Sequence, residues 1–383
     1  MKIQAYRRGG SFGIRNHVVV LASVSCANSI VEAVAAADGE VVAVTHQHGC
    51  THLGDDRRQV LRTLAGTCGN PNVGGALIIG LGCESTPPEA IAAEVPPDGR
   101  VIRTMLIQQV GEPRRLVEQA LGHVAEMKAH AASLRREEFD ISGLVVGLEC
   151  GGSDPFSGLT ANPAVGLVSD RLVAAGATVV LSEVTEMIGA EEALRPRIPD
   201  AGVRGRLFGR IGDYVELARR QECDLRGVNP TPGNIAAGLS TIEEKSLGCI
   251  CKGGRSEIVE FVGYAERPSR RGLVVMDTPG NDPESLTGMA AGGCQAMLFT
   301  TGVGTPLGNP VAPVVKIASN SGMFGRMRAF MDLDAGGVIA GRPLAAVADE
   351  LFDFLLAVCS GRLTAAERNR CREFAVNRIG PTY

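Results

Sequence analysis

The chain has 383 residues with a formal net charge of −4, and 45% of its residues are hydrophobic, 21% charged and 4% aromatic, with no tryptophan. This composition lacks the basic excess and the stacking aromatics of nucleic-acid-binding proteins. No apolar run is long enough to cross a bilayer and residues 1–13 are polar and basic, so we expect a cytoplasmic protein with reduced thiols, despite its eleven cysteines.

Short apolar runs alternate with helical patterns along the chain. The predicted strands are, in chain order, residues 18–24, 41–45, 76–81, 101–107, 144–148, 178–182, 273–277 and 296–300. The predicted helices include residues 29–37, 113–134, 283–291 with Asp282 as the cap, and 345–359. This alternation predicts an α/β protein with Rossmann-like, doubly wound, mostly parallel sheets and two or more subdomains.

A charged stretch at residues 135–140 ends the long predicted helix and precedes a new strand. We therefore expect a first Rossmann-like α/β domain at residues 1–138 and a second α/β domain at residues 139–383. Residues 76–85 and 143–153 resemble each other, because both run from an apolar strand through Gly-Leu to Cys and Glu. Either the chain contains an internal repeat, or both are buried strands that end at a polar crevice.

The segment after the predicted strand at residues 41–45 contains three of the six histidines, at positions 46, 48 and 52. Residues two apart in an extended segment point the same way, so His46, His48 and Cys50 could share one face just past a strand end. Ligands bind at the carboxyl ends of strands in open α/β sheets. The segment is thus either a metal or proton-transfer site, or a turn with solvated histidines.

Polar residues also follow the other predicted strands. These groups are Cys26 and Asn28, Cys83 and Glu84, Glu149 to Asp154, Ser182 with Glu183 and Glu186, Asp277 to Asp282, and Thr300 with Thr301. Mixed His, Asp, Glu and Cys ligands suit Fe²⁺, Mn²⁺ or Zn²⁺. A Lewis acid beside a base favours removal of a proton next to a carboxylate and departure of a neighbouring hydroxyl.

Residues 227–234 are rich in turn formers and lead into a short predicted helix that ends at Gly253, with Thr241 and Glu244 as a capping box. Lys245 and Lys252 in this region are candidate bases, or charges on a solvated helix end. Cys249 and Cys251 are interpreted as structural, because residues two apart on a helix face nearly opposite sides.

Taken together, the motifs of the chain resemble those of the altronate and galactarate dehydratase family. The resemblance covers nearly the whole chain, and it is carried by residues 13–16, 46–56, 70–73, 80–84, 149–154, 157–163, 231–234, 241–246, 276–280 and 299–302. Such proteins convert sugar acids into 2-keto-3-deoxy acids, typically with divalent iron or manganese. A related member is a sulfo-lyase that eliminates sulfite from (2R)-sulfolactate.

The resemblance implies a metal-dependent β-elimination from a 2-hydroxy sugar acid such as altronate or galactarate. We expect Fe²⁺, or alternatively Mn²⁺ or Zn²⁺, and a metal-ligand set of His48, Cys50, Cys83, Glu84 and Cys150. In the working mechanism His48 or Lys245 is the base, and Glu149 or His46 is the acid. The motif residues expected to bind substrate are Arg15, Asn16, Ser153, Asp154, Thr231, Asn234 and Thr301.

Two motifs depart from the family pattern. Gly9 and Ser11 stand where the family usually has Asp and Arg, and Val303 replaces the arginine of a Thr-Gly-Arg-Gly motif. Arginine binds carboxylates bidentately, so these changes point to a different or smaller acid. Full-length relatives also begin with a small domain, which split systems supply as a separate subunit. We therefore expect such a subunit as a partner, and a homo-oligomer.

Two other function classes are compatible with the same residues. One is a hydrolase or redox enzyme that uses Cys150 or Cys50 as a nucleophile. The other is a non-catalytic sugar-acid-binding subunit of a complex.

Overall fold

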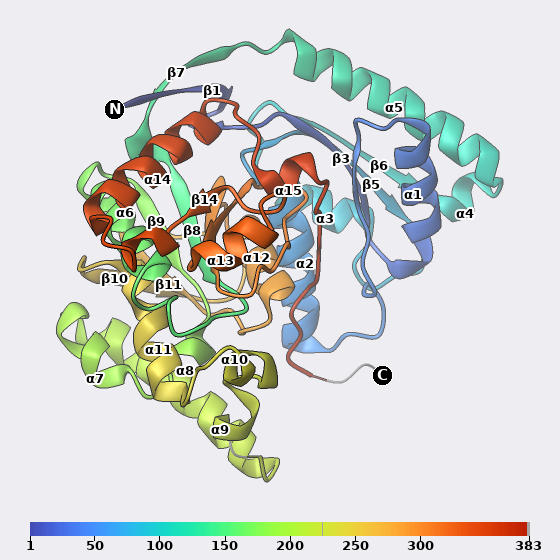
Figure 1. The fold of residues 1–383 in the computed structure, drawn as a ribbon. Helices are drawn as coiled ribbons and strands as arrows, with labels where there is room; N and C mark the ends of the chain where they lie inside the picture. The colour runs from blue at the N-terminus through green and yellow to red at the C-terminus, as the bar shows by residue number, and fades with distance from the viewer. Residues whose placement is uncertain (224, 381–383) are drawn as a thin grey trace.

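The computed structural model describes residues 1–223 and 225–380, which form two parallel sheets covered by helices and one small antiparallel sheet (Figure 1). The α/β fold class predicted from the sequence is confirmed. All eight predicted strands are present, with bounds shifted by up to three residues. No helix in the described ranges is long and apolar enough to span a membrane.

The first sheet has four parallel strands in the order β4-β3-β5-β6. They are β3 (His17–Ala22), β4 (Val42–Val44), β5 (Val73–Gly80) and β6 (Val101–Leu106), and the helices around them are α1 (Asn28–Ala37), α2 (Gly54–Cys68), α3 (Pro88–Glu94), α4 (Ile107–Val110) and α5 (Pro113–Ser133). The chain leaves β3 for β4 on one side and returns to β5 on the other. The topological switch point therefore lies between β3 and β5.

The second sheet has seven parallel strands in the order β10-β11-β9-β8-β12-β13-β14. They are β8 (Val145–Cys150), β9 (Thr178–Leu181), β10 (Ile258–Val262), β11 (Gly272–Met276), β12 (Ala296–Thr301), β13 (Val314–Ala318) and β14 (Leu333–Asp334). Strands β9 to β11 lie on one side of β8, and β12 to β14 lie on the other. The switch point of this sheet is thus between β8 and β12.

Ten α-helices accompany the second sheet in the described part of the chain. They are α6 (Ala161–Ala174), α7 (Glu191–Leu194), α8 (Ala201–Arg220), α9 (Leu225–Val228), α10 (Pro232–Ala236), α11 (Ile242–Ile250), α12 (Asp282–Ala291), α13 (Ser321–Arg326), α14 (Leu344–Cys359) and α15 (Ala365–Arg368). Asp282 was expected to cap α12, but the N-cap residue is Asn281 and Asp282 is the first helical residue. The carboxylate of Asp282 is therefore available for other contacts.

The small antiparallel sheet was not predicted from the sequence. It has the order β2-β1-β7 and consists of β1 (Lys2–Arg8), β2 (Ser11–Gly13) and β7 (Arg136–Asp140). The charged stretch interpreted as a boundary is therefore an edge strand, where charged side chains are common. Ile3 and Ala5 of β1 are buried in the core of the second sheet.

The two parallel sheets share an interior. One apolar cluster contains Val19 and Leu64 from the first unit together with Met289 and Phe299 from the second. Helices α2 and α12 pack closely, since a Cβ on Gly66 would lie 2.4 Å from the carbonyl oxygen of Ala291. This packing holds the carboxyl edge of the second sheet in a fixed position relative to the first unit.

Candidate active site

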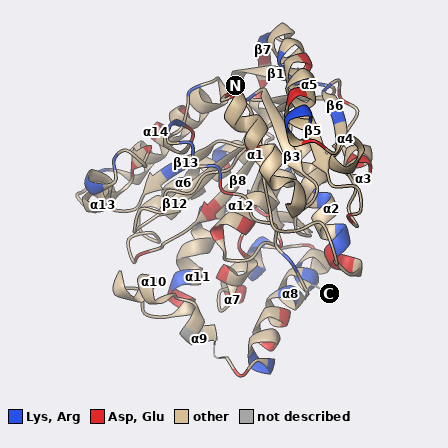
Figure 2. Cartoon of the chain, turned by 90° about the vertical axis from the view of Figure 1, so that its right-hand side faces the viewer, with Lys and Arg blue, Asp and Glu red and all other residues tan. Residues whose placement is uncertain are grey.

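Three carboxylates meet at the switch point of the second sheet. Glu149 belongs to β8, Glu183 follows β9, and Asp282 begins α12. One oxygen of each lies within 4.8 Å of one oxygen of the others. Figure 2 shows acidic positions gathered in the middle of the molecule, between α12, α11 and α7. Strand ends, rather than sequence proximity, thus bring these groups together.

Glu183 forms a buried ion pair with Lys252, a residue that the sequence indicated only as a candidate base. The Lys252 Nζ atom lies 2.6 Å from Glu183 Oε2, and neither side chain is more than 1% exposed. Burial alone would lower the pKa of Lys252, but Cys150, Cys249 and Glu183 raise it well above its usual value. Lys252 is therefore a fixed positive charge beneath the carboxylates.

Glu183 has a left-handed backbone, with φ of 64°, which is uncommon for a residue with a side chain. Its amide donates to Thr278 Oγ1 at 2.7 Å, and its Oε2 accepts from the amide of Cys150 at 2.9 Å. The conformation turns the carboxylate back over the end of β8. Such strain is typical of functional sites.

The hydrogen bonds around Glu149 indicate that this buried carboxyl group carries a proton. Ser182 Oγ lies 2.6 Å from both Leu148 O and Glu149 Oε2. A hydroxyl group has one hydrogen, and a carbonyl oxygen only accepts, so both contacts are hydrogen bonds only if Glu149 is protonated. Burial, followed by the charges of Glu183 and Asp282, raises the pKa of Glu149 well above its usual value.

Asp282 is the partly accessible member of the trio. Burial, and then the charge of Glu183, raises its pKa to about 7. The nearby Lys316 has its pKa lowered to about 7 by burial, and its Nζ atom lies 3.0 Å from the centre of the Phe299 ring. Groups with pKa values near the working pH are suited to proton transfer. Asp282 can therefore both donate and accept a proton at neutral pH.

A second ion pair stands beside this cluster. Lys245 Nζ lies 2.9 Å from Glu186 Oε1 and 2.7 Å from Asn229 Oδ1. Burial lowers the pKa of Lys245, but the negative charge and hydrogen bond of Glu186 raise it by more. The pKa is therefore above its usual value. Lys245 therefore carries a positive charge at neutral pH. This charge makes it better suited to hold an anion than to act as the expected base.

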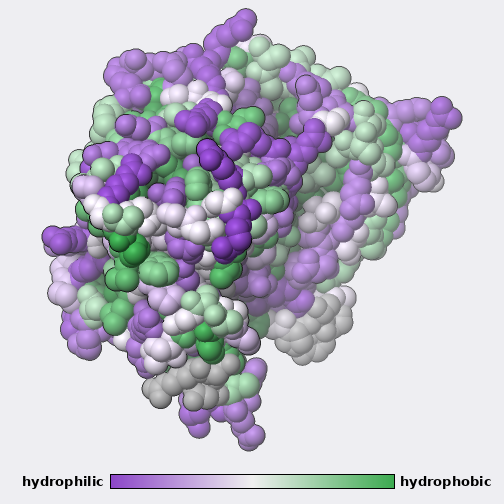
Figure 3. All heavy atoms as spheres, viewed as in Figure 1, coloured by the Kyte–Doolittle hydropathy of each residue, from purple (hydrophilic) through white to green (hydrophobic). Residues whose placement is uncertain are grey.

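Lys245 also lines a cavity of about 330 Å³. The other lining residues include Ser153, Asn162, Gly248 and Cys251, and the three clustered carboxylates are not among them. Leu159 and Leu247 at this cavity are exposed, and Figure 3 shows hydrophobic patches among hydrophilic side chains on the face that carries α10 and α11. The volume is at the lower end of the roughly 300–1,000 Å³ typical of small-molecule sites.

Thr231 and Asn234 form the capping box of α10. Asn234 also donates to the carbonyl oxygen of Ser153 at 2.9 Å, and Ser153 lines the cavity. The turn segment and the loop after β8 are thus joined at the cavity wall. These three predicted substrate-binding residues lie together, and the contacts of Thr231 and Asn234 are structural.

Asp154 and Thr301 have side chains that are already fully engaged. Asp154 Oδ1 accepts from Ser157 and from Ser319, while its Oδ2 accepts from Asn320. Thr301 Oγ1 accepts from the amides of the following turn, at Gly304 and Thr305. Both residues shape the loops at the carboxyl edge, and Asp154 is also among the residues that line the cavity.

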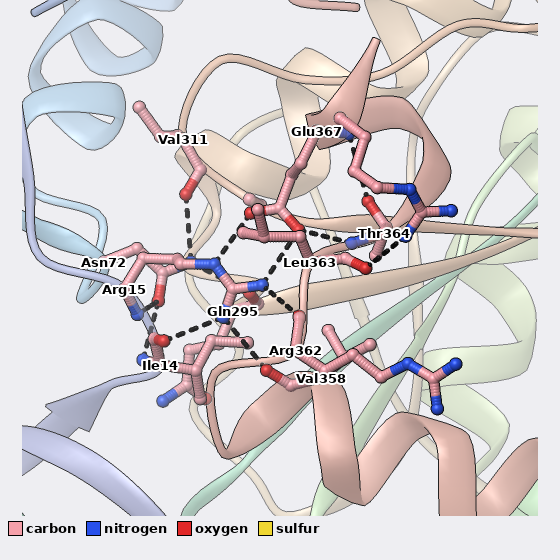
Figure 4. Close-up of polar contacts among 12 residues, drawn as sticks. Ile14, Arg15, Asn72, Gln295, Val311, Val358, Arg362, Leu363, Thr364 and Glu367 are labelled. Carbon is pink, nitrogen blue, oxygen red and sulfur yellow. Dashed lines mark hydrogen bonds and ion pairs between the residues drawn. The ribbon is translucent and has the colours of Figure 1, made fainter. Parts of the chain in front are cut away.

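Arg15 was expected to bind substrate, and the structure corrects this expectation (Figure 4). All five N–H groups of its guanidinium donate within the protein. They bond to the carboxylate of Glu367 and to the carbonyl oxygens of Ile14, Val358 and Arg362. Because arginine has no further donor, it cannot also hold a substrate carboxylate.

Asn16, also expected to bind substrate, makes hydrogen bonds within the fold. Its Oδ1 accepts from Arg8, and its Nδ2 donates to the carbonyl oxygen of Ala131 at 2.8 Å. Both ends of the amide are therefore occupied by neighbouring parts of the fold. The motif that contains Arg15 and Asn16 joins the start of the chain to distant segments.

The histidine-rich segment lies in the first unit, beneath the end of the chain. His46 Nε2 lies 2.7 Å from the carbonyl oxygen of Ala22, and burial lowers the pKa of His46 to about 4. His48 Nε2 lies 3.3 Å from the carbonyl oxygen of Val376. These contacts hold both histidines within the fold of the first unit and against the segment after α15, whereas Lys245 and Glu149 belong to the second unit.

The predicted metal ligands divide in the same way. His48, Cys50, Cys83 and Glu84 belong to the first unit, where the carboxylate of Glu84 accepts from Ser23 and from the amide of Gly82. Cys150 belongs to the second unit, where ligand atoms of Cys150, Glu183 and Cys249 lie within 4.8 Å of one another. Cys249, interpreted as structural from helical spacing, therefore does point toward another thiol.

The sequence indicated Glu183, Glu186 and Asp282 as polar residues after predicted strands but assigned them no role in the site, and it did not indicate Lys316. Glu183, Glu186 and Asp282 each follow a predicted strand closely, and this position was the only sequence feature that pointed to them. The fourth, Lys316, lies within β13, which was not predicted. Ordinary charged residues at strand ends are common, so only the topology showed which of them converge.

Comparison with known proteins identifies two matching family models. The model described as D-galactarate/altronate dehydratase, C-terminal, matches residues 141–382. The model described as D-galactarate dehydratase/altronate hydrolase, second domain, matches residues 5–132.

Three curated relatives illustrate the similarity. Altronate dehydratase of Escherichia coli is 36% identical over 393 aligned positions, which cover 100% of this chain and 78% of the relative. The (2R)-sulfolactate sulfo-lyase subunit beta of Chromohalobacter salexigens is 37% identical, with 98% and 96% covered. Galactarate dehydratase (L-threo-forming) of Escherichia coli is 40% identical, with 79% and 59% covered.

Proposed function

The chain belongs to the D-galactarate/altronate dehydratase family of carbon–oxygen lyases, and we propose that it dehydrates a 2-hydroxy sugar acid to a 2-keto-3-deoxy acid. The observation that carries the proposal is that the charged Lys245 lines the cavity and also acts on the carboxyl group of Asp282 behind it, whose pKa is about 7. Elimination from a hydroxy acid requires an anion-binding group and a proton-transfer group side by side.

In this proposal Lys245 binds the substrate carboxylate. The cavity lies next to the N-terminal end of α6, whose first residues include Asn162 of the lining. The positive end of the helix dipole favours an anion there. Asp282 removes the proton next to the carboxylate and returns a proton to the departing hydroxyl group. The protonated Glu149 keeps the surrounding negative charge low.

The family resemblance also implies a divalent metal, and the carboxylate trio fits one. Glu149, Glu183 and Asp282 offer three oxygens within 4.8 Å, and Glu149 Oε1 has no hydrogen-bond partner among the described residues. Carboxylate oxygens suit Mn²⁺ and Fe²⁺. When bound, such an ion would polarise a substrate oxygen. Binding of the ion would displace the proton from Glu149, because a carboxylate must be ionised to act as a ligand.

A second candidate is elimination of sulfite from (2R)-sulfolactate. The relative named as a sulfo-lyase subunit is matched over 96% of its length. Val303, which stands in place of the family arginine, is exposed beside the loop after β8, where a Cβ on Gly152 would lie 2.3 Å from its side chain. Because sulfolactate carries both a carboxylate and a sulfonate, loss of that cation does not itself favour it, and this candidate rests on the similarity to the sulfo-lyase subunit.

The test is a substrate screen with the anaerobically purified protein and Fe²⁺. Altronate, galactarate, related aldonates and sulfolactate are each assayed for 2-keto acid and for sulfite. We expect 2-keto acid from one sugar acid, and at least a tenfold loss of turnover in Lys245→Gln but a smaller loss in Lys245→Arg. If sulfolactate releases sulfite and no sugar acid yields a 2-keto acid, the second candidate is established. Ester or amide hydrolysis without elimination would refute both candidates.

We also propose that the chain works with a smaller second subunit. A relative that is similar over nearly its whole length is named as subunit beta, which supports this arrangement. A second subunit would exclude bulk water from a site that is otherwise open at the cavity mouth. We expect turnover to rise when the small N-terminal domain of an altronate dehydratase is added in trans. Full activity of the chain alone, unchanged by that addition, would refute the proposal.

A further inference from the structure

The first unit has its own carboxyl edge, and the proposed reaction does not use it. Three cysteines follow the three adjacent strands of that edge, namely Cys26 after β3, Cys50 after β4 and Cys83 after β5. The switch point of this sheet lies between β3 and β5, so Cys26 and Cys83 flank it. Ligands of open α/β sheets bind in the crevice at that place.

Backbone contacts hold the three cysteine-bearing loops against one another. The amide of Ser25 donates to the carbonyl oxygen of His48 at 2.8 Å, and the amide of Ser85 donates to that of Gly49 at 3.1 Å. Gly49 has φ of 119°, and a Cβ there would lie 2.5 Å from the Cα atom of Val24. The loops are therefore closely packed, and each carries its cysteine next to such a contact.

The thiols are also accessible. Cys26 and Cys83 are exposed and Cys50 is half-buried. Among the described residues only one other cysteine, Cys223, is exposed. Exposed free thiols are generally avoided on protein surfaces, so this grouping calls for a ligand.

We propose that Cys26, Cys50 and Cys83 hold an iron–sulfur cluster at the switch point of the first sheet. Three thiolates are soft ligands that select zinc, copper(I) or iron–sulfur centres. On binding, each thiol loses its proton to solvent. With three protein ligands, one iron keeps an open position for a water molecule or an oxygen-donor ligand.

The spacing of the sulfur atoms favours a cluster over a single ion. Tetrahedral zinc with bonds of about 2.3 Å requires its sulfur ligands roughly 3.8 Å apart. The three sulfur atoms do not all lie within 4.8 Å of one another. A cluster separates its protein ligands by the width of its own iron and sulfide core, so it does not require the sulfur atoms to be as close as a single ion does.

The surroundings of the cysteines also suit a cluster. Cys50 packs against an apolar group that contains Val24, Ala27 and Leu81. An apolar floor limits solvent access and tunes the potential of such a centre. The carboxylate of Glu84 is engaged by Ser23 and by the amide of Gly82, so the site would be completed by sulfur ligands and not by this acid.

The test measures metal and sulfide, and therefore does not depend on the proposed reaction. The full chain is reconstituted anaerobically with iron, sulfide and a thiol reductant, then desalted. We expect bound iron with acid-labile sulfide, a visible absorption band that dithionite bleaches, and an electron paramagnetic resonance signal of a cluster. The Cys26→Ser, Cys83→Ser and double variants should lose at least 80% of the sulfide.

Cys223→Ser is the matched control, because Cys223 is exposed but lies outside the first unit. It should retain the full iron and sulfide content. Alkylation of the reconstituted protein, mapped by mass spectrometry, should modify Cys223 and spare the three cluster cysteines. Wild-type sulfide content in the double variant, absence of labile sulfide in the wild type, or binding of zinc alone would overturn the proposal. Circular dichroism confirms that each variant is folded.

Discussion

At the scale of single residues, the candidate active site depends on charges that burial has moved away from their usual behaviour. Glu149 is a protonated acid, Lys252 is a buried cation and Asp282 titrates near neutrality. The sequence identified Glu149 and Lys245 as candidates from their positions. It could not assign their protonation, because that depends on hydroxyl groups and charges contributed by other strands.

The first prediction concerns Asp282. Its pKa in the folded protein is about 7, above the ordinary value of 3.8, so folding favours its protonated form. The stability associated with this group is therefore lost as pH rises from about 4 to about 7. We expect Asp282→Asn to be more stable relative to wild type at pH 8 than at pH 5, measured by urea unfolding at both pH values.

The same substitution should abolish the ionisation near pH 7 in the profile of kcat/KM against pH. Glu284→Gln, a change in the same helix, is the control and should leave that ionisation in place. An unchanged profile in Asp282→Asn would assign proton transfer to another group.

The second prediction concerns the buried pair of Lys252 and Glu183. Removal of one partner leaves an uncompensated buried charge, which typically costs about 3–5 kcal/mol. We expect Lys252→Met to lower the free energy of unfolding by this amount, measured by chemical denaturation. The double variant Lys252→Met with Glu183→Gln should recover part of the loss.

Lys128→Met provides the comparison for this experiment. Lys128 contacts Asp38 and Glu40 near the surface, where ion pairs contribute at most about 1 kcal/mol. Equal losses in Lys128→Met and Lys252→Met would show that the buried pair has no special role in stability.

At the scale of secondary-structure elements, hydrophobic runs and helix periodicity were sufficient to locate the buried strands. The eight predicted strands are all four strands of the first sheet and the four adjacent strands β11, β9, β8 and β12 of the second. β7 was missed because an edge strand with four charged residues has no apolar signal, and α8 was missed because it contains four glycines. Patterns of local sequence do not reveal which strand ends become neighbours, so only part of the site could be predicted.

The third prediction concerns the segment after α15, which runs along α2 in Figure 1. Asp56 in the first turn of α2 accepts from the amides of Ile379 and Gly380 at 2.6 Å and 2.9 Å. Hydrogen bonds to a charged group contribute about 1.5–3 kcal/mol. We expect Asp56→Ala to accelerate hydrogen exchange at residues 376–380 while α2 stays protected.

Asp55→Ala is the matched control, since Asp55 lies in the same turn but is exposed and pairs only with Arg58 among the contacts described for it. Its exchange pattern should equal that of wild type. If the two variants behaved alike, the segment would be held by other contacts, such as that between His48 and Val376.

At the scale of the whole molecule, one side chain connects the beginning of the chain to its end. Arg15 donates to Glu367 and to the carbonyl oxygens of Val358 and Arg362, more than 340 residues away in sequence. The family motif that contains this arginine is thus among the supports of the fold, while the cation that lines the cavity is Lys245.

The fourth prediction follows from this connection. Lysine cannot reproduce the planar fork of arginine, so Arg15→Lys leaves several buried carbonyl groups without donors. We expect the free energy of unfolding to fall by about 3 kcal/mol, because unsatisfied buried polar groups cost about 1–3 kcal/mol each. Arg7→Lys, which alters the exposed pair with Glu137, should change it by less than about 1 kcal/mol. Similar values for the two variants would refute the structural assignment of Arg15.

The placement of β1 has a consequence for how the chain is made. The amide of Gln4 donates to Ser360 Oγ, across 356 positions of sequence, and β1 packs against α14. A ribosome that adds about 5–20 residues per second finishes α14 on the order of half a minute after it has made β1. During that interval the first strand emerges without its packing partner, so its apolar residues are a natural binding site for a chaperone on the nascent chain.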